Sequence, residues 1–380
     1  MKLNLFESES IANLYPLTLT RPAADLRIGI LTIAEKWQKY LGASAIGFET
    51  RDYLAQKFTL LENPDFYING HLLPNKILVD AILKLTDGQA LYHNKVLLAA
   101  KGNIAHNIEF DGHISLIERP YHIFKLNHQE IIADFELLTA GRTSATISNS
   151  NTVFGKHTVF LEEGATMECA TLNTNDGPIY IGKNAEIMEG SIVRGPLAMC
   201  EGAKLKLGTK VYGATTLGPY CNVGGEVNNI VMHGHSNKGH DGFLGNAVLG
   251  EWCNIGADTN CSNLKNTYDE VKVWNYATNR FERSGQQFCG LIMGDHSKCG
   301  INTMFNTGTV VGVACNLFGA GFPRQFVPDF SWGGASGFVP HQMPAVEKTA
   351  QLVMVRRSKE FNEVERHILH WIYDNYTPTA

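Results

Sequence analysis

The first candidate for chemistry in this sequence is a glycine-rich segment that contains a histidine. His240 lies between Gly239 and Gly242 within SNKGHDGFLGN (236–246). Glycine permits close approach of another molecule to the backbone, and an imidazole accepts protons near neutral pH. His240 is therefore a candidate general base. The alternative is that His240 only fixes its own loop by hydrogen bonds.

Metal binding is a second chemistry to consider for this segment. His233, His235 and Asp241 lie near His240 in the sequence, and together they have the residue types of a metal site. Glycine-rich loops also carry histidines that bind no metal, and we predict none here. The eight cysteines lie between Cys169 and Cys315 without a CxxC pair, which favours small buried thiols over zinc ligands.

Asparagines follow the histidines in EWCNIGADTNCSNLKN (251–266). Asn254, Asn260 and Asn263 fall on successive turns of the chain. An asparagine side chain can orient a substrate amide or hydroxyl. Asparagine also tolerates the left-handed backbone of a tight corner, which is the structural alternative.

Two arginines near the N-terminus are candidate phosphate ligands. Arg21 and Arg27 lie in YPLTLTRPAADLRIGI (15–30), and a guanidinium group binds phosphate well. No glycine-rich phosphate loop precedes them, because LFESESIANLY contains no glycine. Surface ion pairs are the alternative role for both arginines.

A six-residue repeat must position these candidates. Between Ile181 and Asn228 every sixth residue is aliphatic or Met, and the residue four positions later is mostly small. The aliphatic positions are Ile181, Ile187, Val193, Met199, Leu205, Val211, Leu217 and Val223. This period predicts a parallel β-helix of short strands, with the aliphatic side chains inside and the small ones near the corners.

The rest of the chain divides around that coil. Residues 1–145 alternate apolar strands with helical segments and predict a small α/β domain that ends in a connecting helix over 119–139. Residues 146–321 form the coil, with loops thrown out at 228–242 and 264–291, the second one a hairpin. Residues 322–380 are a Pro- and Gly-rich cap over the open end of the coil, followed by one helix from Pro344 to about Tyr376.

Composition limits the function classes. The 380 residues are 44% hydrophobic and carry a net charge of −5, so bulk charge gives no reason to expect nucleic acid or membrane binding. No apolar run is long enough for a membrane span, and the first residues lack the pattern of a signal peptide. We expect a cytoplasmic protein with reduced thiols.

Several segments resemble a known family. SNKGHDGFLGNAVLGEWCNIGADTNCSN (236–263) resembles the acetyltransferase half of the bifunctional glucosamine-1-phosphate acetyltransferase / N-acetylglucosamine-1-phosphate uridyltransferases. PLTLTRPAADLRIGILTIAEKW (16–37) resembles a shortened nucleotidyltransferase opening, and NGHLLP (69–74) resembles the metal-binding turn of that family. The chain is thus similar to a short-headed bacterial form of this bifunctional protein, which makes the precursor UDP-N-acetylglucosamine.

The resemblance implies roles for individual residues. His240 would be the catalytic base, Asn254 and Ala257 would contact the sugar substrate, and Asn263 would meet acetyl-CoA. Phe243 stands where the family has a sugar-contacting Tyr. The family also implies a left-handed coil, a homotrimer with the site between subunits, and acetyl-CoA and a sugar phosphate as substrates.

Departures from the family pattern concern phosphate binding. Asn222 replaces an Arg, and a Lys expected before His240 has no counterpart; Lys206, Lys210, Arg194 or Lys238 can substitute, and we include Lys238 among the substrate-binding candidates. In the head the glycine-rich loop is missing and His71 replaces the metal-binding Asp.

Three functions therefore remain open. The first is an acetyl-CoA-dependent N-acetyltransferase acting on a hexosamine-1-phosphate of the glucosamine-1-phosphate type. The second is a sugar-1-phosphate nucleotidyltransferase, uridylyl or thymidylyl, which would need Mg²⁺. The third is a non-catalytic scaffold that binds sugar nucleotides.

Overall fold

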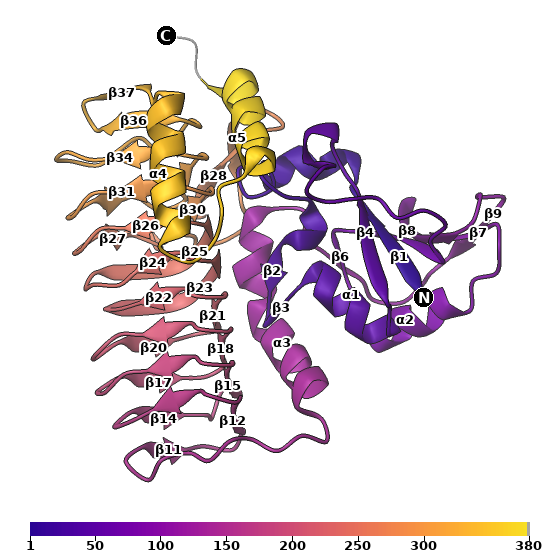
Figure 1. The fold of residues 1–380 in the computed structure, drawn as a ribbon, viewed down its shortest axis with the longest axis horizontal. Coiled ribbons are helices and arrows are strands. Elements are labelled where there is room, and N and C mark those ends of the chain that lie inside the picture. Colours follow the sequence, from indigo (N-terminus) through magenta and orange to yellow (C-terminus); the bar gives the residue numbers. More distant parts are fainter. Residues whose placement is uncertain (378–380) are drawn as a thin grey trace.

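A small α/β region opens the structure, which is a computed structural model that describes residues 1–377 (Figure 1). One six-stranded sheet forms its centre. In sheet order the strands are β4 (Ala45–Glu49), β1 (Lys2–Phe6), β5 (Phe66–Asn69), β8 (Val96–Lys101), β7 (Gln89–His93) and β9 (His106–Glu109). The helices α1 (Ile33–Leu41) and α2 (Lys76–Leu83) pack on it, as the sequence predicts.

Short elements complete this head region. Three short 3-10 helices cover Glu9–Leu14, Ala23–Asp25 and Asp52–Leu54. Two small antiparallel pairs are β2 (Arg27–Ile28) with β3 (Leu31–Thr32), and β6 (Leu72–Leu73) with β10 (Ser115–Leu116). Thr32 forms a capping box with Glu35, which starts α1 immediately after β3.

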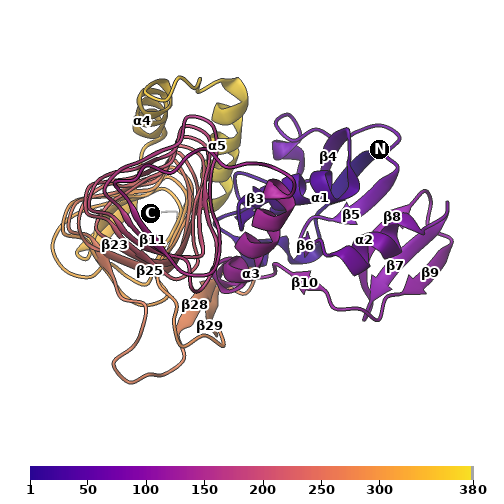
Figure 2. The same cartoon turned by 90° about the horizontal axis from the view of Figure 1, so that it is seen from below.

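Most of the remaining chain is a parallel coil with three sides, and this confirms the predicted fold class (Figure 2). Side A consists of β12 (Val159–Leu161), β15 (Ile179–Ile181), β18 (Leu197–Met199), β21 (Thr215–Leu217), the second halves of β23 (Glu226–Gly234) and β25 (Phe243–Glu251), β30 (Ile292–Met293), β33 (Val310–Val311) and β35 (Phe326–Val327).

The other two sides follow the same stacking. Side B consists of β13 (Thr166–Met167), β16 (Glu186–Ile187), β19 (Lys204–Leu205), β22 (Asn222–Val223), β24 (Asn237–Lys238), β26 (Asn254–Ile255), β31 (Lys298–Cys299), β34 (Asn316–Leu317), β36 (Ser331–Gly334) and β37 (Gly337–Pro340). Side C consists of β11 (Thr152–Phe154), β14 (Thr171–Asn173), β17 (Ile192–Arg194), β20 (Lys210–Tyr212), the first halves of β23 and β25, β27 (Asn260–Cys261) and β32 (Met304–Phe305).

The repeat positions behave as predicted. All eight aliphatic positions from Ile181 to Val223 are at most 2% exposed and stack in one core inside the coil. The small positions between them, such as Ala185 and Ala203, are buried as well. Seven of the eight cysteines are also buried, and all eight are free thiols. Burial of aliphatic side chains against their copies in the next turn therefore holds the coil together.

The head packs on side A of the coil. The helix α3 (Pro120–Thr139) lies along this side, as predicted for 119–139 (Figure 2). Ile131 and Phe135 of α3 contact an outward-facing row of the coil that includes Phe160 and Tyr180. Further along, Val231, Val248, Ile292 and Val310 join the core of the head. Outward-facing residues of side A thus complete the core of the head, while the interior of the coil is a separate apolar cluster.

One predicted excursion stays inside the coil. Residues 228–242, expected to be a loop, run through β23 and β24 as part of one turn. That turn takes 15 residues from Val223 to Lys238, whereas the turn from Leu205 to Val223 takes 18. The missing residues break the six-residue period, because the nine-residue β23 passes from side C to side A in one strand. The second excursion does contain the predicted hairpin, β28 (Lys272–Asn275) with β29 (Arg280–Arg283).

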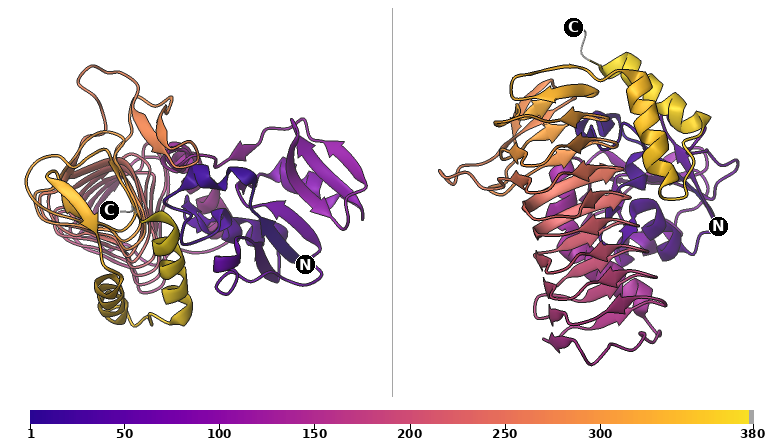
Figure 3. Two further views of the ribbon diagram at one scale, coloured as in Figure 1. Left: turned by 90° about the horizontal axis from the view of Figure 1, so that it is seen from above. Right: turned by 60° about the vertical axis from the view of Figure 1, so that its left-hand side comes forward.

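The C-terminal segment differs from the expectation in two ways. The coil continues past residue 321 for one more turn, and β37 closes it by pairing antiparallel with β36. The single predicted helix is two helices, α4 (Met343–Val355) and α5 (Glu363–Tyr376), which lie beside the coil (Figure 3). After α4 ends at Val355, Ser358 turns the chain with a positive φ of 54°. The Asn362 side chain then caps the start of α5.

Candidate functional site

His240 sits at the corner between sides B and C of the coil. It follows β24 and precedes β25, and its side chain is exposed. Two cavities of about 890 and 450 Å³ meet at this corner, and both are lined by Lys206, Gly239, His240 and Ala257. Among residues 1–377, no hydrogen bond engages the imidazole of His240. A ligand entering either cavity therefore meets a ring that is free to accept a proton.

The smaller cavity has an acidic side. Asp241 and Asp258 line it and lie on successive turns, where the Asp258 amide donates to the Asp241 carbonyl at 3.0 Å. Both side chains are exposed. Carboxylates in the same cavity as the candidate base favour a positively charged or hydrogen-bond-donating group, such as an amine.

The larger cavity lies between side B and the C-terminal end of α4, and we name it the α4 groove. Its floor is a ladder of outward-facing polar residues, Asn222, Asn237, Asn254 and Lys298, which pair in register. Arg356 and Arg357, which directly follow α4, also line it. Asn254 thus lies near His240 as the resemblance implied, on the adjacent strand of side B.

Lys238 lines neither cavity, and the expected contact of this residue with substrate stays a prediction. Its register places it above the inward-facing Val223, and its side chain is 1% exposed. The ammonium group donates to the carbonyls of Gly224 at 2.8 Å and His240 at 2.9 Å. Burial lowers the pKa of Lys238 to about 8. The lysine is an internal tether of the His240 corner.

Two other predicted residues lie away from His240 within the chain. Phe243 is on side C, where its amide donates to the Asn260 side chain at 2.9 Å. Asn263 lies beyond it, near the opposite edge of that side, and its side chain donates to Asn246 at 2.7 Å. A single chain therefore does not bring Asn263 to the candidate base.

The neighbouring histidines separate onto different parts of the coil. His235 stacks on Trp252 at 4.2 Å between ring centres, at the edge between sides A and B. His233 is buried under the head, and its Nδ1 accepts a hydrogen bond from the Arg27 amide. Throughout residues 1–377, no three or more His, Cys, Asp or Glu side chains are arranged to hold a metal ion.

Arg21 and Arg27 form the junction of head and coil. Arg21 is 4% exposed and is paired with Asp25 and Glu251 at 3.3 Å each and with Asp295. Arg27 is also buried, and its guanidinium donates to the backbone carbonyls of Ile30 and His233. Ion pairing is therefore the role of Arg21, but the pairs are buried, not at the surface as the sequence indicated.

The metal-binding turn of the resembled family is altered in this head. His71 is 1% exposed, its Nδ1 lies 2.9 Å from the Ile117 carbonyl, and its Nε2 lies 3.3 Å from the Ser8 hydroxyl. Desolvation lowers the pKa of His71, so the ring stays neutral. A neutral imidazole with both nitrogens engaged does not fit a Mg²⁺ ion, which prefers carboxylate oxygens.

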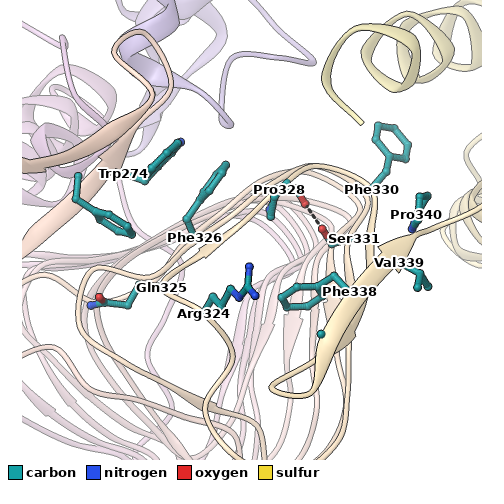
Figure 4. A pocket seen from close by; sticks show the side chains of 12 residues that line it. Trp274, Arg324, Gln325, Phe326, Pro328, Phe330, Ser331, Phe338, Val339 and Pro340 are labelled. Atoms are coloured by element: carbon teal, nitrogen blue, oxygen red, sulfur yellow. Dashed lines mark hydrogen bonds between the residues drawn. The ribbon is translucent and has the colours of Figure 1, made fainter. Parts of the chain in front are cut away.

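A third cavity, of about 950 Å³, is lined mainly by apolar residues at the C-terminal end of the coil (Figure 4). Trp274 of the hairpin stacks on Phe326 there, and Phe338 and Val339 line the opposite part. Arg324 is the one ionisable residue in its lining. The cavity lacks an acid–base group, so we place the candidate chemistry at His240.

Sequence reasoning missed three residues of the α4 groove. Lys298 follows the second excursion, which interrupts the six-residue period. The sequence therefore does not show that Lys298 lies beside Asn254 on the next turn. Arg356 and Arg357 belong to a helix end that was predicted to continue. An Arg-Arg pair followed by a helix stop was the available signal for these two.

Comparison with known proteins yields a partial match. Residues 3–143 match a family model described as sugar nucleotidyl transferase. No curated protein matches the chain. No helix among residues 1–377 is long and apolar enough to cross a membrane.

Two solved acyltransferase structures are similar to part of this chain. The UDP-N-acetylglucosamine acyltransferase LpxA from Bacteroides fragilis is 11% identical over 61% of this chain and 98% of its own, with a TM-score of 0.28. The N-acyltransferase AntD from Bacillus cereus, in complex with dTDP and 3-hydroxybutyryl-CoA, is 14% identical over 57% of this chain and 100% of its own, with a TM-score of 0.25. At these values neither likeness carries an argument about this chain.

Proposed function

We propose that the protein is an acetyl-CoA-dependent N-acetyltransferase acting on a hexosamine-1-phosphate of the glucosamine-1-phosphate type. The observation that carries the proposal is the position of His240, whose imidazole makes no hydrogen bond within residues 1–377 and lines two cavities, one with Asp241 and Asp258 and one without a carboxylate. The resemblance of residues 236–263 to the acetyltransferase family supports the same function.

The proposed reaction uses His240 as the base. The imidazole takes a proton from the sugar amine as the nitrogen attacks the thioester carbonyl of acetyl-CoA. The tetrahedral intermediate collapses, the C–S bond breaks, and the thiolate leaves and is protonated to free CoA. Asp241 and Asp258 favour the amine beside the base, and Asn254 and Ala257 contact the sugar.

The experiment is a thiol-release assay with acetyl-CoA and glucosamine-1-phosphate. Removal of a general base lowers the rate by about 10²- to 10⁴-fold, so we expect that loss for His240→Ala. His157→Ala, at another exposed site on the coil, is the matched control and keeps the wild-type rate. A His240→Ala rate equal to wild type would exclude the imidazole as the base.

The proposal includes a homotrimer. Asn263 does not reach His240 within one chain, so a role for it at acetyl-CoA requires a second subunit. Sedimentation equilibrium should then give three times the 41.9 kDa chain mass. A monomer with full thiol release would remove Asn263 from the site.

The match of residues 3–143 favours a second candidate, a sugar-1-phosphate nucleotidyltransferase. This function needs Mg²⁺ and positive charge at the phosphates. Magnesium-dependent pyrophosphate release from UTP or dTTP with a panel of sugar phosphates is the test. Release above background would support this activity for the head, and its absence across the panel would exclude it.

A further inference from the structure

We propose that the α4 groove is a phosphate-ester site in which Arg356 and Arg357, at the C-terminal end of α4, and Lys298 of side B contact the ligand. This inference rests on the proposed function and names the part of the site that would hold a phosphorylated substrate. It assigns α4, which lies beside the coil, to the binding site.

The charge of the groove is one-sided. Lys206, Lys298, Arg356 and Arg357 line it, and no Asp or Glu does. Within residues 1–377 none of the four takes part in an ion pair. Four cations around one cavity of about 890 Å³ repel each other, and an anion relieves that repulsion.

Lys298 is the most enclosed of these cations. Its ammonium donates to the His296 carbonyl at 2.8 Å, and the Trp252 carbonyl lies at 3.5 Å. Loss of solvent lowers the pKa of Lys298 to about 8. Neutral carbonyls only partly replace the lost water, so an anion that fills the groove would stabilise the charged form.

Arg357 is held over the floor of the groove. Its Nη2 donates to the Asn237 side-chain oxygen at 3.1 Å, and Asn222 donates to the same oxygen at 2.6 Å. This contact leaves the other guanidinium donors free of hydrogen bonds within the described chain. A guanidinium group can offer two parallel N–H bonds to a phosphate.

Attraction between these arginines and the end of their own helix is the competing explanation. Cations near a helix C-terminus do interact favourably with its carbonyls. That effect does not account for Lys298 and Lys206, which come from the coil and line the same groove. The neighbouring cavity shares Lys206 with the groove but adds Asp241 and Asp258, so Lys298, Arg356 and Arg357 are the cations that line the groove alone.

The phosphate can belong to either substrate of the proposed reaction. Acetyl-CoA carries a pyrophosphate and a 3′-phosphate, and a hexosamine-1-phosphate carries one phosphate monoester. Titration calorimetry with CoA, glucosamine-1-phosphate and inorganic pyrophosphate distinguishes the sources. Unphosphorylated glucosamine and pantetheine serve as the matched probes.

We expect the Arg356→Ala/Arg357→Ala variant to bind CoA or glucosamine-1-phosphate at least tenfold more weakly, and pyrophosphate likewise. The CoA arm identifies the donor as the occupant, and the sugar arm identifies the acceptor. Affinity for the unphosphorylated probes should not change. Arg357→Lys should recover part of the lost affinity, and Lys348→Ala, an exposed residue of α4, should match wild type.

Two results would overturn the inference. One is that the double variant binds every phosphorylated probe as tightly as wild type does. Failure of the wild type to bind any of these probes counts as the same result. The other is an equal loss for the unphosphorylated probes. Wild-type protein separates this test from the proposed function, because phosphate affinity and thiol release can fail independently. Binding of the phosphorylated probes as expected, without thiol release, would retain this inference and exclude the proposed function.

Discussion

Replacement of the internal Lys238 by Met should change how stability depends on pH. The ammonium lies inside an apolar coil and bonds only two carbonyls, including that of His240. Met has nearly the same length and shape but no charge. The substitution therefore removes the ionisation of this site and leaves the packing close to that of wild type.

The size of the effect follows from the pKa of Lys238. Burial places it at about 8 in the folded chain, against about 10.4 for an exposed lysine. Between these values the unfolded chain binds more protons than the folded one, so stability rises with pH. From pH 7 to 9.5 the wild type should gain about 2 kcal/mol relative to Lys238→Met.

Urea unfolding followed by circular dichroism at both pH values measures this difference. Lys298→Met should show a similar loss of pH dependence, because the pKa of Lys298 is also lowered to about 8. Lys204→Met, at a partly exposed side chain of the same coil, serves as the control. Parallel pH profiles for wild type and Lys238→Met would mean that water reaches the ammonium group and that the tether is wrong.

Three further substitutions test the packing. Arg21→Met leaves Asp295 and Glu251 without their buried partner and should cost about 3–5 kcal/mol in urea unfolding, whereas Arg283→Met on the exposed hairpin should be neutral. Leu205→Ala opens a cavity inside the coil and should cost about 2–5 kcal/mol, and Leu207→Ala, 69% exposed on the same turn, should stay within about 0.5 kcal/mol. Asn362→Ala removes the cap of α5 and should lower stability by about 1 kcal/mol, which thermal unfolding detects. Equal losses of stability for Arg21→Met and Arg283→Met, or for Leu205→Ala and Leu207→Ala, would contradict the burial on which that prediction rests.

The coil could be predicted from the sequence because its period is tied to side-chain burial. Each inward position from Ile181 to Val223 must be apolar to stack on its neighbours. The six-residue spacing of apolar residues therefore reveals the register. The prediction ended at the 15-residue turn, where the inward position is filled by Lys238. From the sequence, a lysine is expected at the surface. Only the three-dimensional structure shows the two carbonyls that accept hydrogen bonds from its ammonium group.

The candidate site was predictable in part for a related reason. His240 and Asn254 lie on neighbouring turns and carry recognisable local patterns. The α4 groove joins residues that are about a hundred positions apart, such as Asn237 and Arg357, which are separated by 120. A sequence pattern within one segment contains no information about which face of the coil a distant helix covers.

The junction between head and coil also fixes an order of events during synthesis. Asp295 follows Arg21 by 274 residues, and at roughly 5–20 residues per second it leaves the ribosome about 15–55 s later. The coil residues Val231, Val248, Ile292 and Val310, which complete the apolar core of the head, are also made late. During that interval the nascent head exposes an apolar face, and Arg21 has only Asp25 of its three acidic partners, so the head is prone to aggregation until the coil is finished.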